Sequence, residues 1–287
     1  MLPAFLCAAM LILTAPAVAA EKEKTPFLQV DALLTLLDIP HKKNRASMIQ
    51  ATQVWRRKQG VERWEVPASR LEPAKRQAVM ALLHDLGMVG QRLPQQKEYD
   101  HVLVLGGTVP AMERRFQNAV MLSKQGIHFK KIYFLTGQRP LVSEIDRVDS
   151  FVRHVIGSDN PAARPATESE AARMIWFSTP LPSAPAAFVD SARKWQNKQW
   201  VRPCTQDTVE DWLATSPATG SVLVISDQPH IKYQAAVVKR ALPSGFSVDA
   251  SAPAANPQIN INTYLDALAL WLANDDQALL PASVKEG

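Results

Sequence analysis

The chain has 287 residues, of which 47% are hydrophobic and 21% charged, a composition that is typical of a globular protein and excludes a disordered chain or a polytopic membrane protein. This length accommodates one large α/β domain, or a domain with an appendage. The net charge of +5 arises between residues 20 and 98, because that stretch has 14 basic and 9 acidic residues while the rest of the chain is balanced.

The first 19 residues have the pattern of a secretory signal peptide. An apolar run from Leu2 to Leu13 is followed by Ala17-Val18-Ala19, which are small residues at the spacing that signal peptidase accepts. This pattern predicts cleavage before Ala20 and export to the periplasm. No Lys or Arg precedes the apolar run and residues 2–20 carry no charge, so an uncleaved anchor in the inner membrane, facing the periplasm, is the alternative.

Residues 20–98 are predicted to form a basic helical segment. Apolar residues at helical spacing predict helices over 28–37, 46–57 and 71–86, and no strand-like alternation is present. We therefore expect an appendage outside any sheet. Its basic clusters, such as Arg56-Arg57-Lys58, would either contact an anionic membrane surface or simply be solvated helix faces. No nucleic acid is expected as a partner of an exported protein.

From residue 99 to 287, predicted strands and helices alternate. We expect strands at 102–105, 131–135, 200–202, 221–225 and 246–248, with residues 179–187 as a loop. The intervening helices are expected at 111–124, 142–156, 168–177, 207–213, 230–242 and 261–273. Such alternation predicts parallel pairing with right-handed crossovers, and hence an α/β three-layer sandwich with a mostly parallel sheet of about five strands.

Glycines and polar residues follow three of the predicted strands. The carboxyl ends of parallel strands lie along one edge of a sheet, where α/β proteins bind ligands, so these residues are expected to line one crevice. Glycines let the backbone approach a ligand, and a helix start offers free N–H groups to an anion. The residues are Gly106, Gly107 and Thr108 after the first strand, Thr136 and Gly137 after the second, and Ser226, Asp227 and His230 after the strand at 221–225.

A series of short motifs between residues 102 and 240 suggests a family. In chain order they are Leu105-Gly106-Gly107, Arg115-Phe116-Gln117-Asn118-Ala119, Thr136-Gly137, Ser169-Glu170-Ala171, Thr205-Gln206-Asp207-Thr208 and Ser226-Asp227-Gln228-Pro229-His230. In this order they resemble the SanA/ElyC/YdcF-type envelope family, a domain of unknown function with a Rossmann-like sheet. The resemblance implies a role in envelope or peptidoglycan precursor homeostasis, without a defined reaction. The family often places an arginine three residues after the histidine, where this chain has Tyr233, so that end of the pocket would lack a positive charge.

The side chains of these motifs suggest a site that binds an anion and moves a proton. His230 would act as general acid or base, because an imidazole titrates near neutrality. Glu170 and Asp207 would orient His230 or hold a cation, and Arg115 would bind a phosphate or carboxylate through its two-pronged guanidinium. The remaining ligand-binding candidates are Gly106, Gly107, Thr108, Gly137 and Thr208.

Each of these assignments has a structural alternative. His230 would instead cap a helix or be a histidine whose hydrogen bonds are satisfied in the core. Glu170 would be a favourable charge in the first turn of a helix, and Arg115 would lie on the surface. The six histidines lack metal-ligand spacing, so no metal is expected, and the sequence assigns no cofactor and no oligomeric state. Two functions stay open: binding of a small anionic or nucleotide-like ligand at the sheet edge, or a non-catalytic module acting through its basic helices on a membrane or a protein partner.

Overall fold

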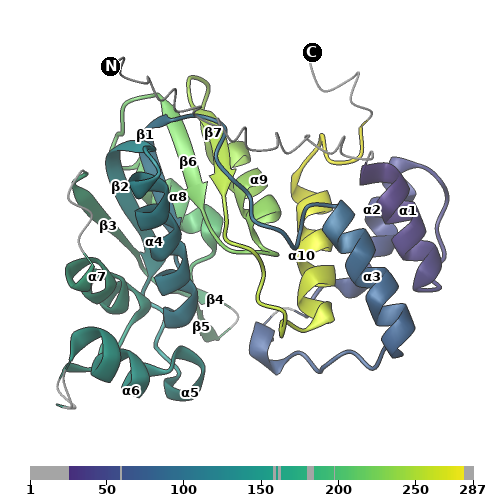
Figure 1. Cartoon of the computed structure of the whole chain (residues 1–287), viewed down its shortest axis with the longest axis horizontal. Helices are drawn as coiled ribbons and strands as arrows, with labels where there is room; N and C mark the ends of the chain where they lie inside the picture. The colour runs from purple at the N-terminus through teal and green to yellow at the C-terminus, as the bar shows by residue number, and fades with distance from the viewer. Residues whose placement is uncertain are drawn as a thin grey trace, which may run out of the picture.

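The computed structural model describes residues 26–58, 60–157, 160, 163–179, 184–196 and 198–280 (Figure 1). The predicted leader at residues 1–19 lies outside the described residues, so export stays a prediction. Within the described ranges, no helix is both long enough and apolar enough to cross a membrane.

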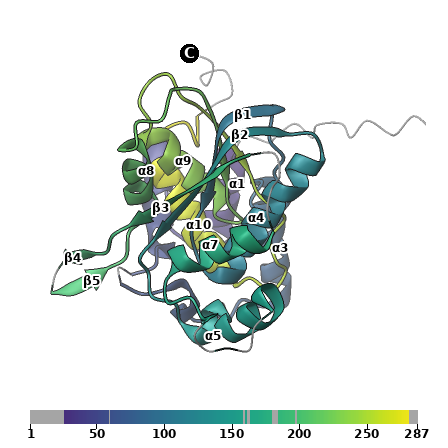
Figure 2. The same cartoon turned by 90° about the vertical axis from the view of Figure 1, so that its left-hand side faces the viewer.

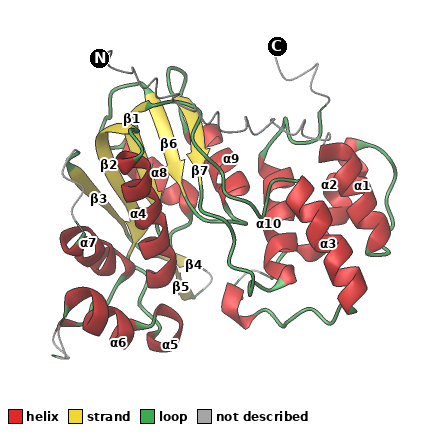
Figure 3. Ribbon diagram, viewed as in Figure 1, coloured by secondary structure: helices red, strands yellow, loops and turns green. Residues whose placement is uncertain are grey.

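The centre of the fold is a five-stranded sheet in which every neighbouring pair is parallel (Figure 3). Its strands are β1 (Glu98–Leu105), β2 (His128–Gly137), β3 (Ala186–Ser191), β6 (Ser221–Ile225) and β7 (Ser247–Ser251). They lie in the order β3-β2-β1-β6-β7. The predicted α/β class with a parallel sheet of five strands is therefore confirmed.

One strand of this sheet was assigned wrongly from the sequence. The strand that was not predicted is β3, whose first two residues fall in the stretch 179–187, which was expected to be a loop. The prolines and alanines of that stretch gave no strand signal, and β3, as an edge strand, is paired on one side only. The segment 200–202 was predicted instead, but β5 (Gln199–Val201) pairs antiparallel with β4 (Lys194–Gln196) in a separate two-stranded ribbon.

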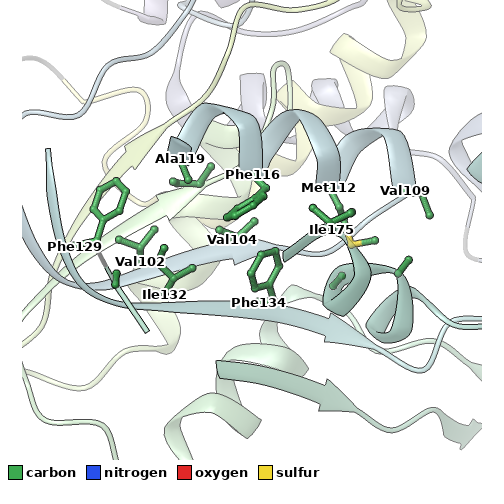
Figure 4. Packing of buried hydrophobic residues seen from close by; sticks show 14 of the residues in the cluster. Val102, Val104, Val109, Met112, Phe116, Ala119, Phe129, Ile132, Phe134 and Ile175 are labelled. Atoms are coloured by element: carbon green, nitrogen blue, oxygen red, sulfur yellow. The ribbon is translucent and has the colours of Figure 1, made fainter. Parts of the chain in front are cut away.

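Alternate residues of the strands face opposite helical layers, as the two-residue period of a strand requires. On one face, Val102 and Val104 of β1 pack with Phe134 of β2 against helices α4 (Val109–Lys124) and α7 (Glu168–Ser178), as Figure 4 shows. On the other face, Leu103 and Leu105 pack against α8 and α9. The bounds of these two helices are Thr205–Leu213 for α8 and Ile231–Ala241 for α9.

The predicted helix over 142–156 is interrupted. It consists of two single-turn helices, α5 (Ser143–Asp146) and α6 (Val148–Phe151), followed by a π-helical turn over Val152–Ile156. The break is at Arg147, which has a left-handed backbone with φ of 50°. That break places the carboxylate of Asp146 against the start of α4, where it accepts a hydrogen bond from the Val109 N–H.

The N-terminal helices form a second core together with the last helix of the chain. Leu33, Leu83 and Leu268 are completely buried in this core, which in Figure 1 lies beside the sheet domain. Because α10 also packs on α9, this last helix connects the N-terminal segment to the sheet domain. The helices are α1 (Pro26–Leu36), α2 (Arg45–Thr52), α3 (Pro73–Asp85) and α10 (Ile261–Asn274), with 3-10 turns at Gln53–Trp55 and Arg63–Glu65.

Candidate functional site

The candidate site lies at the carboxyl edge of the sheet. Strand β1 lies between β2 and β6, so the residues that follow these three strands are brought together at one edge, as the sequence predicted. Most of their groups, however, are engaged by the protein's own side chains.

Arg115 holds the edge together rather than facing a ligand. Its side chain is only 2% exposed, and it donates from Nη1 to the backbone oxygens of Leu105 and Gly106 at 2.9 and 2.5 Å. Its Nε and Nη2 donate to Asp227 Oδ1 at 3.1 and 2.5 Å. Burial disfavours the charged carboxylate, yet Arg115 and its neighbours hold the pKa of Asp227 well below its usual range. The donors of Arg115 thus bind a carboxylate and two carbonyls of the protein itself, and these contacts do not support the predicted anion-binding role.

The glycines of the edge make room for internal groups. A Cβ on Gly106 would lie 2.0 Å from Glu168 Oε1, and a Cβ on Gly137 would lie 2.2 Å from Pro203 Cγ. A Cβ on Gly107 would lie 3.2 Å from Arg115 Nη1. A carboxylate, a proline ring and a guanidinium of the protein thus lie where side chains would project from these three glycines.

The start of α4 meets an anion, but that anion belongs to the protein. Thr108 is the N-cap and makes no side-chain hydrogen bond, while Asp146 Oδ1 accepts from the Val109 N–H at 3.0 Å. Arg139 holds Asp146 through two hydrogen bonds of 2.8 and 3.0 Å. The start of α4 thus binds the carboxylate of Asp146, where an external anion was expected.

Neither predicted carboxylate partner contacts His230. Glu170 is exposed and accepts from the Ala166 N–H at 2.6 Å, which is the helix-start alternative. Asp207 accepts from the Cys204 N–H at 2.7 Å and from Lys194 at 2.5 Å. Thr208 is buried and donates to the Thr205 oxygen at 2.9 Å. Each of these three side chains bonds to a backbone group near the start of its helix.

On α7 the buried acidic residue is Glu168, two residues before the predicted Glu170. Its Oε2 accepts from Arg139 Nε at 3.0 Å, and only 8% of its side chain is exposed. Burial raises the pKa of Glu168, while Arg139 opposes that rise. The sequence pattern missed the Arg139–Glu168 pair because nothing in the spacing of 29 residues indicates that the two groups meet.

His230 lies at the first turn of α9, next to the end of β6. Its backbone N–H bonds to the Asp227 oxygen at 2.8 Å, and its ring is in edge contact with that of Tyr233 at 5.9 Å between centroids. Burial lowers the pKa of His230 well below its ordinary value, and the charges of Arg63, Arg115 and Arg57 lower it further. This environment favours the neutral imidazole, and His230 caps no backbone group through its side chain.

A guanidinium from the N-terminal segment lies beside His230. Arg63 donates from Nη2 to the hydroxyl of Tyr233, and its Cζ is 5.8 Å from the centre of the Tyr233 ring. The family resemblance placed an arginine at position 233, and its absence predicted a missing positive charge. Arg63 brings a guanidinium to that position from a segment 170 residues earlier in the chain.

Arg57 is a second cation of the N-terminal segment whose charge acts on His230. Its backbone N–H donates to Asp266 Oδ1 at 3.0 Å, and its Nη1 lies 3.6 Å from Glu62 Oε2, beyond hydrogen-bond reach. Glu62 is shared with Arg202, whose Nε is 2.9 Å away. Burial and the nearby charge of Arg63 both lower the pKa of Arg57. Arg57 is thus not part of a solvated helix face, as one interpretation of its basic cluster had predicted.

Arg57, Arg63 and His230 form what we call the rim cluster. Each has one buried nitrogen without a hydrogen-bond partner, namely Arg57 Nη1, Arg63 Nε and His230 Nδ1. Arg63 forms no ion pair with any carboxylate of the described ranges, whereas Asp227 is already bound by Arg115 and Arg114. Two guanidinium nitrogens and an imidazole nitrogen that lack partners suit the oxygens of a phosphate or carboxylate.

The rim cluster was only partly accessible from the sequence. His230 was predicted, but Arg57 appeared merely as one member of a basic run, and nothing indicated Arg63.

No group of three or more His, Cys, Asp or Glu residues in the described part of the chain is arranged to hold a metal ion. No protein-family model matches this chain, and no curated protein matches it.

Proposed function

We propose that this protein is exported and binds a small anionic ligand, of the size of a phosphate group or its nucleotide-like esters, at the carboxyl edge of its sheet. The observation that supports this proposal is the set of three buried nitrogens in the rim cluster that lack a hydrogen-bond partner. A buried donor without a partner carries a desolvation penalty of about 1–3 kcal/mol, and more for a charged group, which an anionic ligand would remove.

In this proposal Arg57 and Arg63 provide the charge, and neutral His230 provides a directed hydrogen bond. Arg115 and Asp227 contribute indirectly, because their ion pair fixes the loop between β6 and α9 on which His230 lies. The absence of a carboxylate on Arg63 in the described structure favours an external anion over an internal one.

The alternative, in which the basic helices act on a membrane, receives less support. Some of their cations are paired with internal acids: Lys43 with Asp31 at 3.2 Å, and Lys75 with Asp38 at 2.8 Å. Cations that are neutralised within the fold contribute little to a long-range surface potential.

The test is a thermal-shift titration with inorganic phosphate, pyrophosphate and a panel of nucleotides, followed by calorimetry on any anion that raises Tm. A ligand that binds only the native state adds about 2.7 kcal/mol at a hundredfold excess over its Kd. We expect Arg63→Ala to weaken binding about tenfold to a hundredfold, the range that corresponds to one charged hydrogen bond.

Arg70→Ala is the matched control, because Arg70 is an exposed arginine of the same segment. It should leave affinity unchanged. Equal affinities of the Arg63→Ala and Arg70→Ala variants, or no Tm shift with any anion in a well-folded sample, would refute the proposal.

A further inference from the structure

The two-stranded ribbon β4–β5 is a feature that the rim cluster does not involve. It is separate from the main sheet and projects from the body of the protein, as Figure 2 shows. Trp195 and Trp200 are directly paired across the two strands, with their rings in edge contact at 5.4 Å between centroids. Their exposed fractions are 61% and 58%. The ribbon thus presents two large aromatic rings to its surroundings.

An exposed tryptophan pair on such a short ribbon is costly in water. Each strand has three residues, and isolated two-stranded ribbons are marginally stable by themselves. An indole ring combines an apolar body with an N–H donor, which is why tryptophan is enriched at the boundary between the hydrocarbon and the headgroups of a bilayer. This boundary would remove apolar ring surface from water without burying the N–H group.

The charged residues of the ribbon itself are all basic. Residues 191–202 contain four basic and no acidic residues. Two of the four are paired at the base of the ribbon, Lys194 with Asp207 and Arg202 with Glu62. Arg193 lies over the Trp200 ring at 5.4 Å, and Lys198 is exposed near the tip with a left-handed φ of 62°. Neither of these two cations forms an ion pair with the part of the protein that is described.

We propose that the β4–β5 ribbon binds an anionic membrane surface. The rings of Trp195 and Trp200 enter the headgroup region, while Arg193 and Lys198 contact lipid phosphates. Aromatic rings with basic side chains and no acid at the tip complement a uniformly anionic interface, whereas a specific protein partner would also require shape or opposite charges to fix its register. This inference is independent of the proposed anion site.

The test uses the tryptophan fluorescence of the full chain with vesicles of phosphatidylglycerol that carry brominated acyl chains. All seven tryptophans lie beyond residue 50, so the apolar stretch at residues 2–20 cannot itself be quenched. We expect emission to be lost in brominated relative to unbrominated vesicles, and this loss to disappear in Trp195→Phe/Trp200→Phe. Brominated phosphatidylcholine vesicles should quench much less.

A charge variant tests whether membrane binding depends on the cations of the ribbon or on cations anywhere on the protein surface. Arg193→Gln/Lys198→Gln should raise the lipid concentration for half-maximal quenching about tenfold or more, because each cation near an anionic surface contributes to binding. The control Lys239→Gln/Arg240→Gln removes two exposed cations of α9 and should change it less than about twofold. Absence of quenching, unchanged quenching in Trp195→Phe/Trp200→Phe, or equal effects of the two charge variants would overturn the proposal.

Discussion

Arg63 donates a hydrogen bond to the hydroxyl of Tyr233, and this contact joins the N-terminal segment to the first turns of α9. Tyr233 is 7% exposed, so both partners meet in a protected environment. The contact places a guanidinium beside His230 at the carboxyl edge of the sheet. Without the N-terminal segment, this position beside His230 would lack the Arg63 guanidinium.

Exchange of these two residues tests whether the pair is specific. Tyr233→Arg should destabilise the fold by about 3 kcal/mol or more, because it places a second buried cation against Arg63. The double variant Arg63→Tyr/Tyr233→Arg should recover most of this loss. Urea denaturation of the single and double variants measures the coupling free energy, and a coupling near zero would show that the two side chains do not interact.

Substitution of Asp227 should lower the free energy of unfolding far more than substitution of Arg114, one of its two arginine partners. Asp227→Asn leaves the buried guanidinium of Arg115 without its charge partner, and we expect a loss of about 3–5 kcal/mol in the free energy of unfolding. Arg114→Ala serves as the comparison, since this side chain is 45% exposed although it also binds Asp227 at 2.7 Å. Its loss should be below about 1 kcal/mol. Similar losses in the two variants, measured by chemical denaturation, would contradict the assigned burial.

Two histidines should respond to acid in opposite directions. The pKa of His230 is lowered in the folded state, so the unfolded chain binds the proton more readily, and stability falls as the pH drops below about 6.5. The slope reaches at most about 1.4 kcal/mol per pH unit. His230→Gln should therefore flatten the dependence of the unfolding free energy on pH between 7 and 5.5.

His41 provides the contrast within the same chain. The backbone oxygen of Ile39 and the carboxylate of Asp31 raise the pKa of His41. Its contribution is fully present below about 6.5 and is lost as the pH rises through the raised folded pKa. His41→Gln should consequently steepen the loss of stability on acidification. Parallel pH profiles of both variants and the wild type would be inconsistent with these environments.

Gly106 should not tolerate a side chain. In Gly106→Ala the added Cβ would lie 2.0 Å from Glu168 Oε1 and 2.8 Å from the Leu135 oxygen, and because one of these atoms is backbone, we expect a loss of about 2–3 kcal/mol. Gly90→Ala is the matched control, as a Cβ there meets nothing within 4 Å. Its Tm should stay close to that of the wild type. A tolerated Gly106→Ala would mean that the Glu168 carboxylate is displaced easily.

The order of strands and helices in the second half of the chain was predictable because local patterns specify it. Apolar runs such as 102–105 and 221–225 are nearly continuous, as buried parallel strands require, and their carboxyl ends necessarily share one edge. The edge strand β3 escaped prediction, since its alanines follow a proline-rich stretch and its pairing with β2 is a long-range contact.

The contacts of the site residues could not be predicted from the spacing of motifs along the sequence. The motif residues Arg115, Glu170 and Asp207 were recognisable, but their hydrogen-bond partners were not, and those partners decide whether a group is free for a ligand. Glu168 rather than Glu170 is buried, because the helix α7 turns that side chain toward Arg139.

The α/β class, the parallel sheet and the edge at which its polar residues gather could be predicted, because they follow from the periodicity of hydrophobic residues along short segments. Tertiary structure decided which of those polar groups remain available. Packing of the N-terminal helices against α10 brings Arg57 and Arg63 to His230 across more than 160 residues, and no local pattern encodes a contact that depends on how two distant segments share one core.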